Sequence, residues 1–425
     1  MRRLTVAAGL VALSVLAAAA LLAQARPDAF GVPLTHPAIG YGTRPTHDRV
    51  ARLNDDLARG SVRLPFDATN GYLRGVLAAT GVPVSSQLLV FSETSAQAAH
   101  ISSKNPRAVY FDDDVAVGWV RGADALELAV HDPEQGVVFY TLEQKESATP
   151  RFTRDNSCLL CHDIWETFGV PGFQMLSTFP MEDEKAYASG LVTDHRTPFT
   201  ERWGGWFVTG AAAPTHHYGN LPVVRPVTSR APPRAPILTS VKDQFDLTGY
   251  PTDTSDVVSL LVLEHQTRMA NLITWLGWEA RLVTASGPLS ASGKDRLDYV
   301  ASQLVDYMLF VDEAPMVRPV RGTSGFAEHF AARGKTDSKG RSLRQLDLQT
   351  RLFRYPCSYM IDSTAFAALP AAAKQAVYTR LWAVLSGADR SLPYQTLTFA
   401  DRQAIIEILR DTHVDLQAAS GTAAR

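Results

Sequence analysis

Leu126-Glu-Leu-Ala-Val130 and Gly136-Val-Val-Phe-Tyr-Thr141 are short apolar runs separated by the turn-forming stretch Asp132-Pro-Glu-Gln135. Three further runs of the same kind lie upstream, at residues 87–91, 108–111 and 115–120. Runs rich in β-branched and aromatic residues and bounded by turn chemistry are typical of β-strands. The sequence therefore predicts an antiparallel β region over residues 84–145.

Helical patterns lie on both sides of this β region. Short helices are expected over residues 50–57 and 72–79. A long apolar-rich segment without proline, residues 256–281, follows the start signals Thr252-Asp-Thr-Ser255. Further helices are expected over residues 294–312, 370–386 and 398–411, the last opened by a capping box. This order predicts an α+β fold with a β-rich N-terminal half and a mainly α-helical C-terminal half.

The composition is that of an ordinary soluble globular protein, with 46% hydrophobic and 20% charged residues among 425. The formal net charge is −2, so nothing in the charge balance favours nucleic acid or an anionic membrane surface as a partner. The chain has 3 cysteines, which form no disulfide framework. A chain of this length can build a core without one.

The first 25 residues have the features of a secretory signal peptide (residues 1–25). Arg2 and Arg3 precede an apolar stretch, and Ala23-Gln-Ala25 supplies small residues for cleavage after Ala25. The alternative is an uncleaved membrane anchor, because a bilayer span needs about 20 apolar residues. In either case the remaining chain is expected to be exported, to the periplasm or elsewhere in the cell envelope, with no other membrane contact.

Cys158-Leu-Leu-Cys161-His162 is the C-x-x-C-H pattern of c-type haem attachment. Two intervening residues make about one helical turn, which brings both thiols to the same side for thioether bonds to one porphyrin edge. The following imidazole then lies under the ring plane and reaches the iron. Asp155-Asn-Ser157 supplies N-cap residues just before this turn.

Three other interpretations of this motif stay open. A redox-active disulfide uses C-x-x-C after a strand but has no need of the histidine. A zinc site wants four ligands at finger-like spacing, and the chain has no second C-x-x-C. The pattern also occurs by chance. The export signal favours haem, because c-type attachment takes place outside the cytoplasm.

On Cys158, Cys161, His162 and the export signal, the chain resembles the bacterial c-type cytochromes. It is also similar, over most of residues 84–410, to a poorly described group of bacterial mono-haem c-type proteins. The shared stretches are residues 202–210, 262–266 and 355–359. The resemblance implies haem binding and electron transfer but no known substrate. The chain departs from small cytochromes c because its motif lies in the middle of a larger protein.

Several residues are candidates for the surroundings of the haem. For the second axial position the candidates are His217, Met175 and His195, each of which can equally be an ordinary core residue. Trp165, Trp203 and Trp206 can pack on a porphyrin, and Arg202 can pair with a propionate. Structural roles in the core are the alternative for these too. Cys357 is expected to be a buried, inert thiol.

The chain is thus expected to divide into a β-rich domain (26–150), a short haem-binding segment (151–225), a proline-rich linker (226–238) and a helical domain (239–425). The expected function is one-electron transfer by an exported c-type cytochrome with a single covalent haem c. The alternatives are a peroxidase-like haem oxidoreductase with an open or displaceable sixth ligand, and a haem-based sensor.

The expected partner is a redox protein of unknown identity. A basic loop over residues 314–356 is a candidate docking surface for an acidic partner, and a solvated loop is the alternative.

Overall fold

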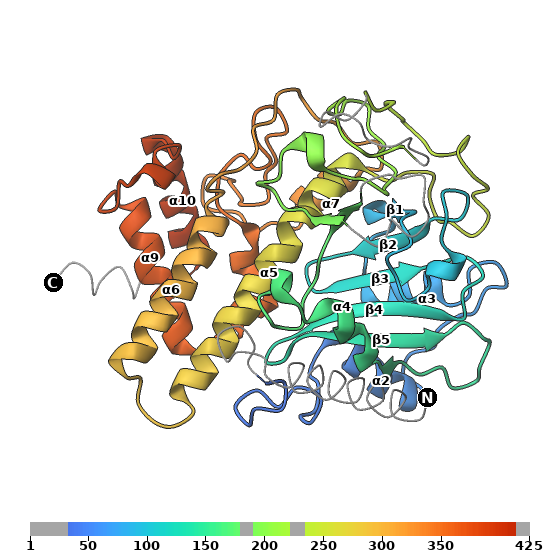
Figure 1. The fold of residues 1–425 in the computed structure, drawn as a ribbon, viewed down its shortest axis with the longest axis horizontal. Helices are drawn as coiled ribbons and strands as arrows, with labels where there is room; N and C mark the ends of the chain where they lie inside the picture. The colour runs from blue at the N-terminus through green and yellow to red at the C-terminus, as the bar shows by residue number, and fades with distance from the viewer. Residues whose placement is uncertain (1–32, 179–189, 222–233, 414–425) are drawn as a thin grey trace, which may run out of the picture.

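The computed structural model describes residues 33–178, 190–221 and 234–413 (Figure 1). The predicted signal peptide, residues 1–25, and most of the predicted linker lie outside these ranges. Within them, no helix combines the length and the apolar character that a membrane crossing requires.

The predicted β region forms one six-stranded sheet whose strands pair antiparallel in sequence order. The strands are β1 (Leu88–Val90), β2 (Arg107–Phe111), β3 (Val115–Trp119), β4 (Ala125–Asp132), β5 (Gly136–Glu143) and β6 (Thr153–Arg154). The antiparallel β region is therefore confirmed, and β6 adds an edge strand beside β5. A separate antiparallel pair consists of β7 (Leu176–Thr178) and β8 (Gly190–Val192).

The β4–β5 turn shows how local sequence sets this topology. Asp132 accepts hydrogen bonds from the backbone N–H groups of Glu134 (2.9 Å) and Gln135 (2.8 Å) through one carboxylate oxygen. Gly136 then has a φ of 86°, in the left-handed region that glycine adopts without steric cost. The turn residues seen in the sequence thus close the hairpin by an aspartate-mediated turn.

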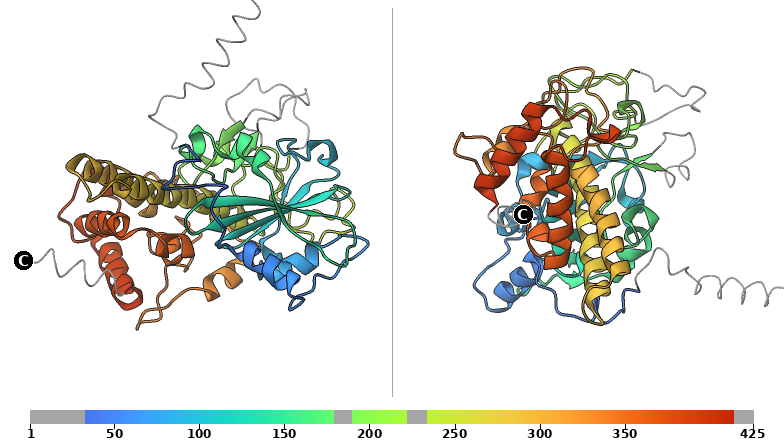
Figure 2. Two further views of the ribbon diagram at one scale, coloured as in Figure 1. Left: turned by 90° about the horizontal axis from the view of Figure 1, so that it is seen from below. Right: turned by 90° about the vertical axis from the view of Figure 1, so that its left-hand side faces the viewer.

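Helices α2 (Arg49–Ala58) and α3 (Leu73–Thr80) cover one face of the sheet, as the edge-on view in Figure 2 shows. Apolar side chains of that face, among them Val117 and Leu128, join Val50 and Leu73 in one buried cluster. Both short helices predicted from the sequence are confirmed.

The opposite face of the central strands carries small and polar side chains. Ala116 lies opposite Ala129 across β3 and β4, and Gly118 lies opposite Glu127 in the same register. Because side chains alternate along a strand, all four lie on the face away from α2 and α3. Ala116, Glu127 and Ala129 are only half-buried. We call these four residues the sheet floor.

The C-terminal half is helical, as predicted. Its elements are α5 (Val257–Thr284), α6 (Ala291–Met308), α7 (Phe326–Ala332), α8 (Thr364–Ala367), α9 (Ala371–Leu385) and α10 (Phe399–Thr412). The capping box expected at the start of α10 is present between Thr398 and Asp401. Helix α6 ends earlier than the sequence predicts, because Phe310 and Asp312 have φ values of 57° and 62°, which no α-helix accommodates.

Helix α7 was not expected, since its residues fall in the predicted basic loop. It begins after Gly325, whose φ is 77°, and buries Phe326 and Phe330 one turn apart. A helix of only seven residues carries too short a periodic pattern to separate from a loop.

Helix α5 joins the two halves of the protein. Its Trp278 belongs to the cluster formed with the sheet, α2 and α3, whereas Leu261 and Met269 belong to the cluster formed with the other helices. Leu88 and Val90 of β1 also enter the helical cluster. The helix is therefore buried almost all round, as its lack of a polar face predicts.

The start of α5 depends on one carboxylate. Asp256 is buried and accepts hydrogen bonds from the backbone N–H groups of Val258 (2.8 Å), Thr323 (2.7 Å) and Ser324 (2.9 Å). It thus caps the helix and ties the loop before α7 to it.

We predict that Asp256→Ala lowers the free energy of unfolding by about 2–4 kcal/mol, because a cap is lost and further buried N–H groups lose their acceptor. Urea-induced unfolding measures the change. Asp243→Ala, at an exposed loop position, is the control and should stay within about 0.5 kcal/mol. Equal stabilities of the two variants would contradict this account.

Candidate functional site

The C-x-x-C-H motif occupies a short helical turn next to the edge of the sheet. Asp155 accepts a hydrogen bond from the backbone N–H of Ser157 (2.9 Å) and so caps the turn, as predicted. The turn runs from a 3-10 segment, η3 (Asn156–Cys158), directly into α4 (Leu159–His162). Both thiols of the motif are free; Cys158 is half-buried and Cys161 is exposed.

The imidazole of His162 is held by a backbone carbonyl. Nδ1 of His162 lies 2.9 Å from the carbonyl oxygen of Gly172. A carbonyl only accepts, so Nδ1 carries the proton and Nε2 keeps its lone pair. Burial lowers the pKa of His162, which keeps the ring neutral. This arrangement, with one nitrogen oriented and the other available, is the usual one for a metal-binding histidine.

The carbonyl that orients His162 is itself fixed to helix α5. Asn271 accepts a hydrogen bond from the N–H of Phe173 (2.8 Å) and donates one to its carbonyl (2.7 Å). A Cβ at position 172 would lie 2.4 Å from the side-chain oxygen of Asn271, so only glycine fits there. The orientation of the imidazole is therefore set by α5, the longest helix among the described residues.

The motif lies beside the sheet floor. The ring of His162 is 4.8 Å from that of Phe139 on β5. The ion pair between Arg107 and Glu127 (2.6 Å) is close enough to influence the pKa values of both Cys158 and His162. Figure 2 shows α4 on the side of the sheet opposite α2 and α3.

Beside the motif, the sheet floor offers two alanines and a neighbouring aromatic ring to an apolar group, while its glycine is covered by an arginine. The sheet floor is nearly free of large side chains, and Arg107 lies over Gly118, where an added Cβ would come within 2.3 Å of its guanidinium. Phe139 offers an aromatic contact, and Arg107 is a partly exposed cation of the kind that pairs with carboxylates.

The thiol chemistry argues against a redox-active disulfide. Burial, with smaller effects of Asp155 and Glu127, raises the pKa of Cys158 to about 11. Thioredoxin-type motifs instead depend on a lowered thiol pKa. Cys357 is fully buried, and burial raises its pKa as well, as befits the inert thiol expected there.

The three candidates for the second axial position are all engaged elsewhere. Nδ1 of His217 accepts a hydrogen bond from the N–H of Gly219 (3.0 Å), its ring also bonds the backbone of Pro214, and burial lowers its pKa to about 4. Met175 is buried in the helical cluster. Nδ1 of His195 lies 2.8 Å from Nδ1 of His265. Met175 is the only one of the three whose neighbour in the sequence contacts the motif. That neighbour, Gln174, donates a hydrogen bond to the carbonyl of Cys161 (2.9 Å).

Arg202 is committed to a buried ion pair. Its guanidinium lies 2.8 Å from the carboxylate of Glu264 on α5, and both side chains are almost inaccessible to solvent. The remaining donors bond the carbonyls of Thr197 (2.7 Å) and His195 (2.9 Å). The structure therefore gives Arg202 a core role, in contrast to Arg107, which sequence reasoning did not identify.

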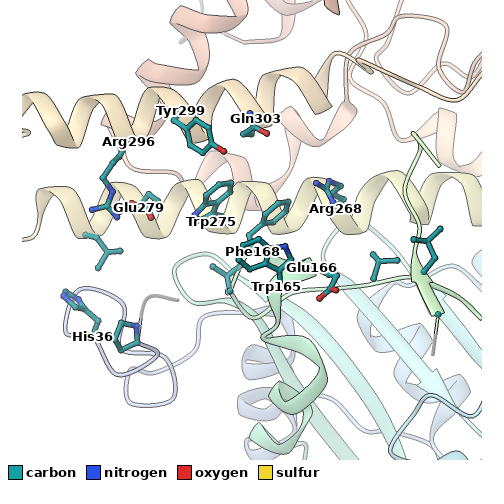
Figure 3. Close-up of a pocket in the computed structure, with 17 residues that line it drawn as sticks. His36, Trp165, Glu166, Phe168, Arg268, Trp275, Glu279, Arg296, Tyr299 and Gln303 are labelled. Carbon is teal, nitrogen blue, oxygen red and sulfur yellow. Dashed lines mark hydrogen bonds and ion pairs between the residues drawn. The ribbon is translucent and has the colours of Figure 1, made fainter. Parts of the chain in front are cut away.

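The three candidate tryptophans lie in different settings. Trp203 is fully buried and contacts His217 edge to face. Trp206 pairs with Val90 at the edge of the sheet and donates from its indole to the carbonyl of Leu176 (2.7 Å). Trp165 is 64% exposed and lines a cavity next to the motif (Figure 3).

The basic loop is largely neutralised by partners within the chain. Its cations form ion pairs with acidic side chains: Arg333 and Arg344 with Asp113, Lys335 with Asp362, Lys339 and Arg341 with Glu407, and Arg351 with Asp401. These ion pairs tie α7 and α10 to the rest of the protein. Arg318, Arg321 and Arg354 of the loop are exposed and form no ion pair within the described residues, so the docking surface for an acidic partner stays a prediction.

Comparison with known proteins adds no relative: no family model, no curated protein and no solved structure matches the chain.

We predict that Arg202→Met destabilises the protein by about 3–5 kcal/mol, because Glu264 is then left buried without its cation. The double variant Arg202→Met/Glu264→Leu should regain most of this loss, since no buried charge remains. Urea-induced unfolding of the single and double variants measures the coupling.

Lys294→Met is the control, because Lys294 and Asp298 form an exposed pair on α6. Its effect should stay below about 1 kcal/mol. Strictly additive losses in the Arg202 and Glu264 variants would show that the two side chains are not coupled.

Proposed function

We propose that this protein is an exported c-type cytochrome that carries one covalent haem c on Cys158 and Cys161 and transfers single electrons in the cell envelope. The observation that carries the proposal is the state of His162. Its Nδ1 donates a hydrogen bond to the carbonyl of Gly172, so the lone pair of Nε2 is available to a metal. The same helical turn carries two free thiols.

Each residue of the site has a defined task in this proposal. Cys158 and Cys161 tether the porphyrin, and Nε2 of His162 binds the iron. When bound, haem c supplies a centre that takes up and releases one electron. The carbonyl of Gly172 fixes the imidazole and raises its basicity, which is how an outer hydrogen bond tunes a metal ligand. Arg107, which is paired with Glu127 in this structure, is the cation that we propose would pair with a haem carboxylate.

The predicted export of the protein supports the same proposal. Residues 1–25 have the pattern of an export signal, and thioether attachment of haem occurs in the compartment to which such signals lead. A redox protein of the cell envelope is the proposed partner.

A second candidate function follows from the positions of His217, His195 and Met175. The two histidines are engaged in hydrogen bonds within the protein, and the methionine is buried in the helical core. A haem whose sixth position lacks a protein ligand is open to small molecules, which favours a peroxidase-like oxidoreductase or a gas sensor.

We predict that the full-length protein, produced together with a c-type maturation system, gains the mass of one porphyrin that survives denaturing electrophoresis. The variant Cys158→Ser/Cys161→Ser should lose covalent haem entirely, because both thioethers are then impossible. Cys357→Ala is the matched control, since that thiol is buried away from the motif and should keep full haem content. Haem staining and intact mass measure the outcome.

A mature polypeptide without any added porphyrin would overturn the proposal. For a haem-loaded protein, the response to carbon monoxide separates the two functions. A low-spin spectrum unchanged by carbon monoxide supports electron transfer, whereas a shifted spectrum supports the oxidoreductase or sensor.

A further inference from the structure

A second site adjoins the motif on the side away from the sheet floor. A cavity of about 680 Å³ lies between helices α5 and α6 and the short turn η4 (Trp165–Thr167) that follows the motif (Figure 3). This volume is in the range of small-molecule sites, roughly 300–1,000 Å³. None of Cys158, Cys161 and His162 lines it.

The walls of the cavity are aromatic. Phe168 and Trp275 stack with an interplanar angle of 5° and centroids 5.1 Å apart. Tyr299 meets Trp275 edge to face at 6.3 Å. Trp165 and Tyr299 are 64% and 60% exposed, which is unusual for large aromatic side chains that face a common hollow. These rings offer faces and edges to a flat ligand.

The charges around the cavity disfavour a charged ligand. Arg296 is paired with Glu279 (2.5 Å), and Arg268 with Asp194 (3.3 Å). Exposed Glu166 adds a negative charge. An anion would therefore meet carboxylates, and a cation would meet guanidinium groups. A neutral ligand avoids both costs.

Hydrogen-bond donors are nevertheless present. Arg268 lies over the rings of Phe168, at 4.8 Å, and Tyr307, at 5.8 Å, and is also paired with Asp194. Its Nε is buried 3.3 Å from Asp194, so the donors that a ligand in the cavity meets are the hydroxyl of Tyr299 and the side-chain amide of Gln303, two exposed lining residues. A ligand with carbonyl or hydroxyl oxygens on its ring edge would match such donors.

The backbone supports this arrangement. Phe168 has a φ of 63°, a left-handed conformation that bulky residues rarely adopt. It ends η4 and brings the ring against Trp275. Residues in such conformations gather at ligand sites, where the surrounding structure holds them in place.

From the aromatic walls, the balanced charges and the available donors, we propose that this cavity binds a neutral, planar ring bearing oxygen, of the quinone or quinol class. Binding itself is independent of haem. The cavity lies only a few residues along the chain from the turn proposed to carry haem. A role for the bound ring in electron transfer therefore rests on the proposed function.

Isothermal titration calorimetry of the full-length, haem-loaded protein with 1,4-naphthoquinone tests the proposal. We expect saturable binding at one site. Trp275→Leu should weaken it by about tenfold, because one stacking wall is lost. Trp382→Leu, which removes a half-buried tryptophan of α9 outside the cavity, should leave it unchanged. Tyr299→Ala is a second test variant, since its exposed side chain contributes little to folding.

The outcomes distinguish this inference from the proposed function. A protein that carries haem but shows no saturable binding, or binding insensitive to both cavity variants, overturns the cavity site and leaves the cytochrome standing. A chain that carries no haem but binds naphthoquinone in the same variant-dependent way supports the site and overturns the cytochrome. Displacement of naphthoquinone by decanoate from the cavity would also overturn the ring-specific site, since it would show a general apolar pocket.

Discussion

The hydrogen bond between His162 and the carbonyl of Gly172 joins the two ends of the loop that follows the motif, and the rest of the site is arranged around it. It is reinforced by a backbone bond from the N–H of Gly172 to the carbonyl of His162 (2.8 Å). Because Asn271 then fixes the next residue to α5, the carbonyl that holds the imidazole is itself held by a buried helix. A metal ligand held in this way needs little reorganisation when it binds.

Helix α5 acts as a common support for otherwise separate parts. It contributes to both large apolar clusters and supplies Glu264 to the ion pair with Arg202. It also supplies Asn271 to the loop after the motif and lines the cavity through Arg268 and Trp275. Most of its length is buried, so any displacement would open voids in two cores at once. The motif and the cavity are therefore positioned by one element, which keeps the distance between them constant.

Local chemistry made much of this structure predictable. The strands were evident from short runs between turn residues, and the capping residues Asp155 and Thr398 behave as their side chains require. The role of a side chain was harder to predict wherever the residue that it contacts lies far away in the sequence. Glu264 is 62 residues from Arg202, so nothing local revealed that this arginine belongs to the core. Gly172 follows a proline in the sequence, and only its contact with Asn271 shows why glycine is required there. Arg107 and Phe139 lie on separate strands, and it is the sheet register that brings them near His162.

The small side chains of the sheet floor give a physical reason why a cofactor at this place would need covalent attachment. Alanine and glycine side chains contribute little apolar contact area, and the stabilisation from burial scales with the area removed from water. A porphyrin beside Ala116 and Ala129 would gain less from such a surface than from a deep pocket of large side chains. Two thioether bonds would remove that dependence on contact area. In the proposed cytochrome they would also keep the haem near the surface, where Cys161 is exposed, and electron exchange with another protein requires such access.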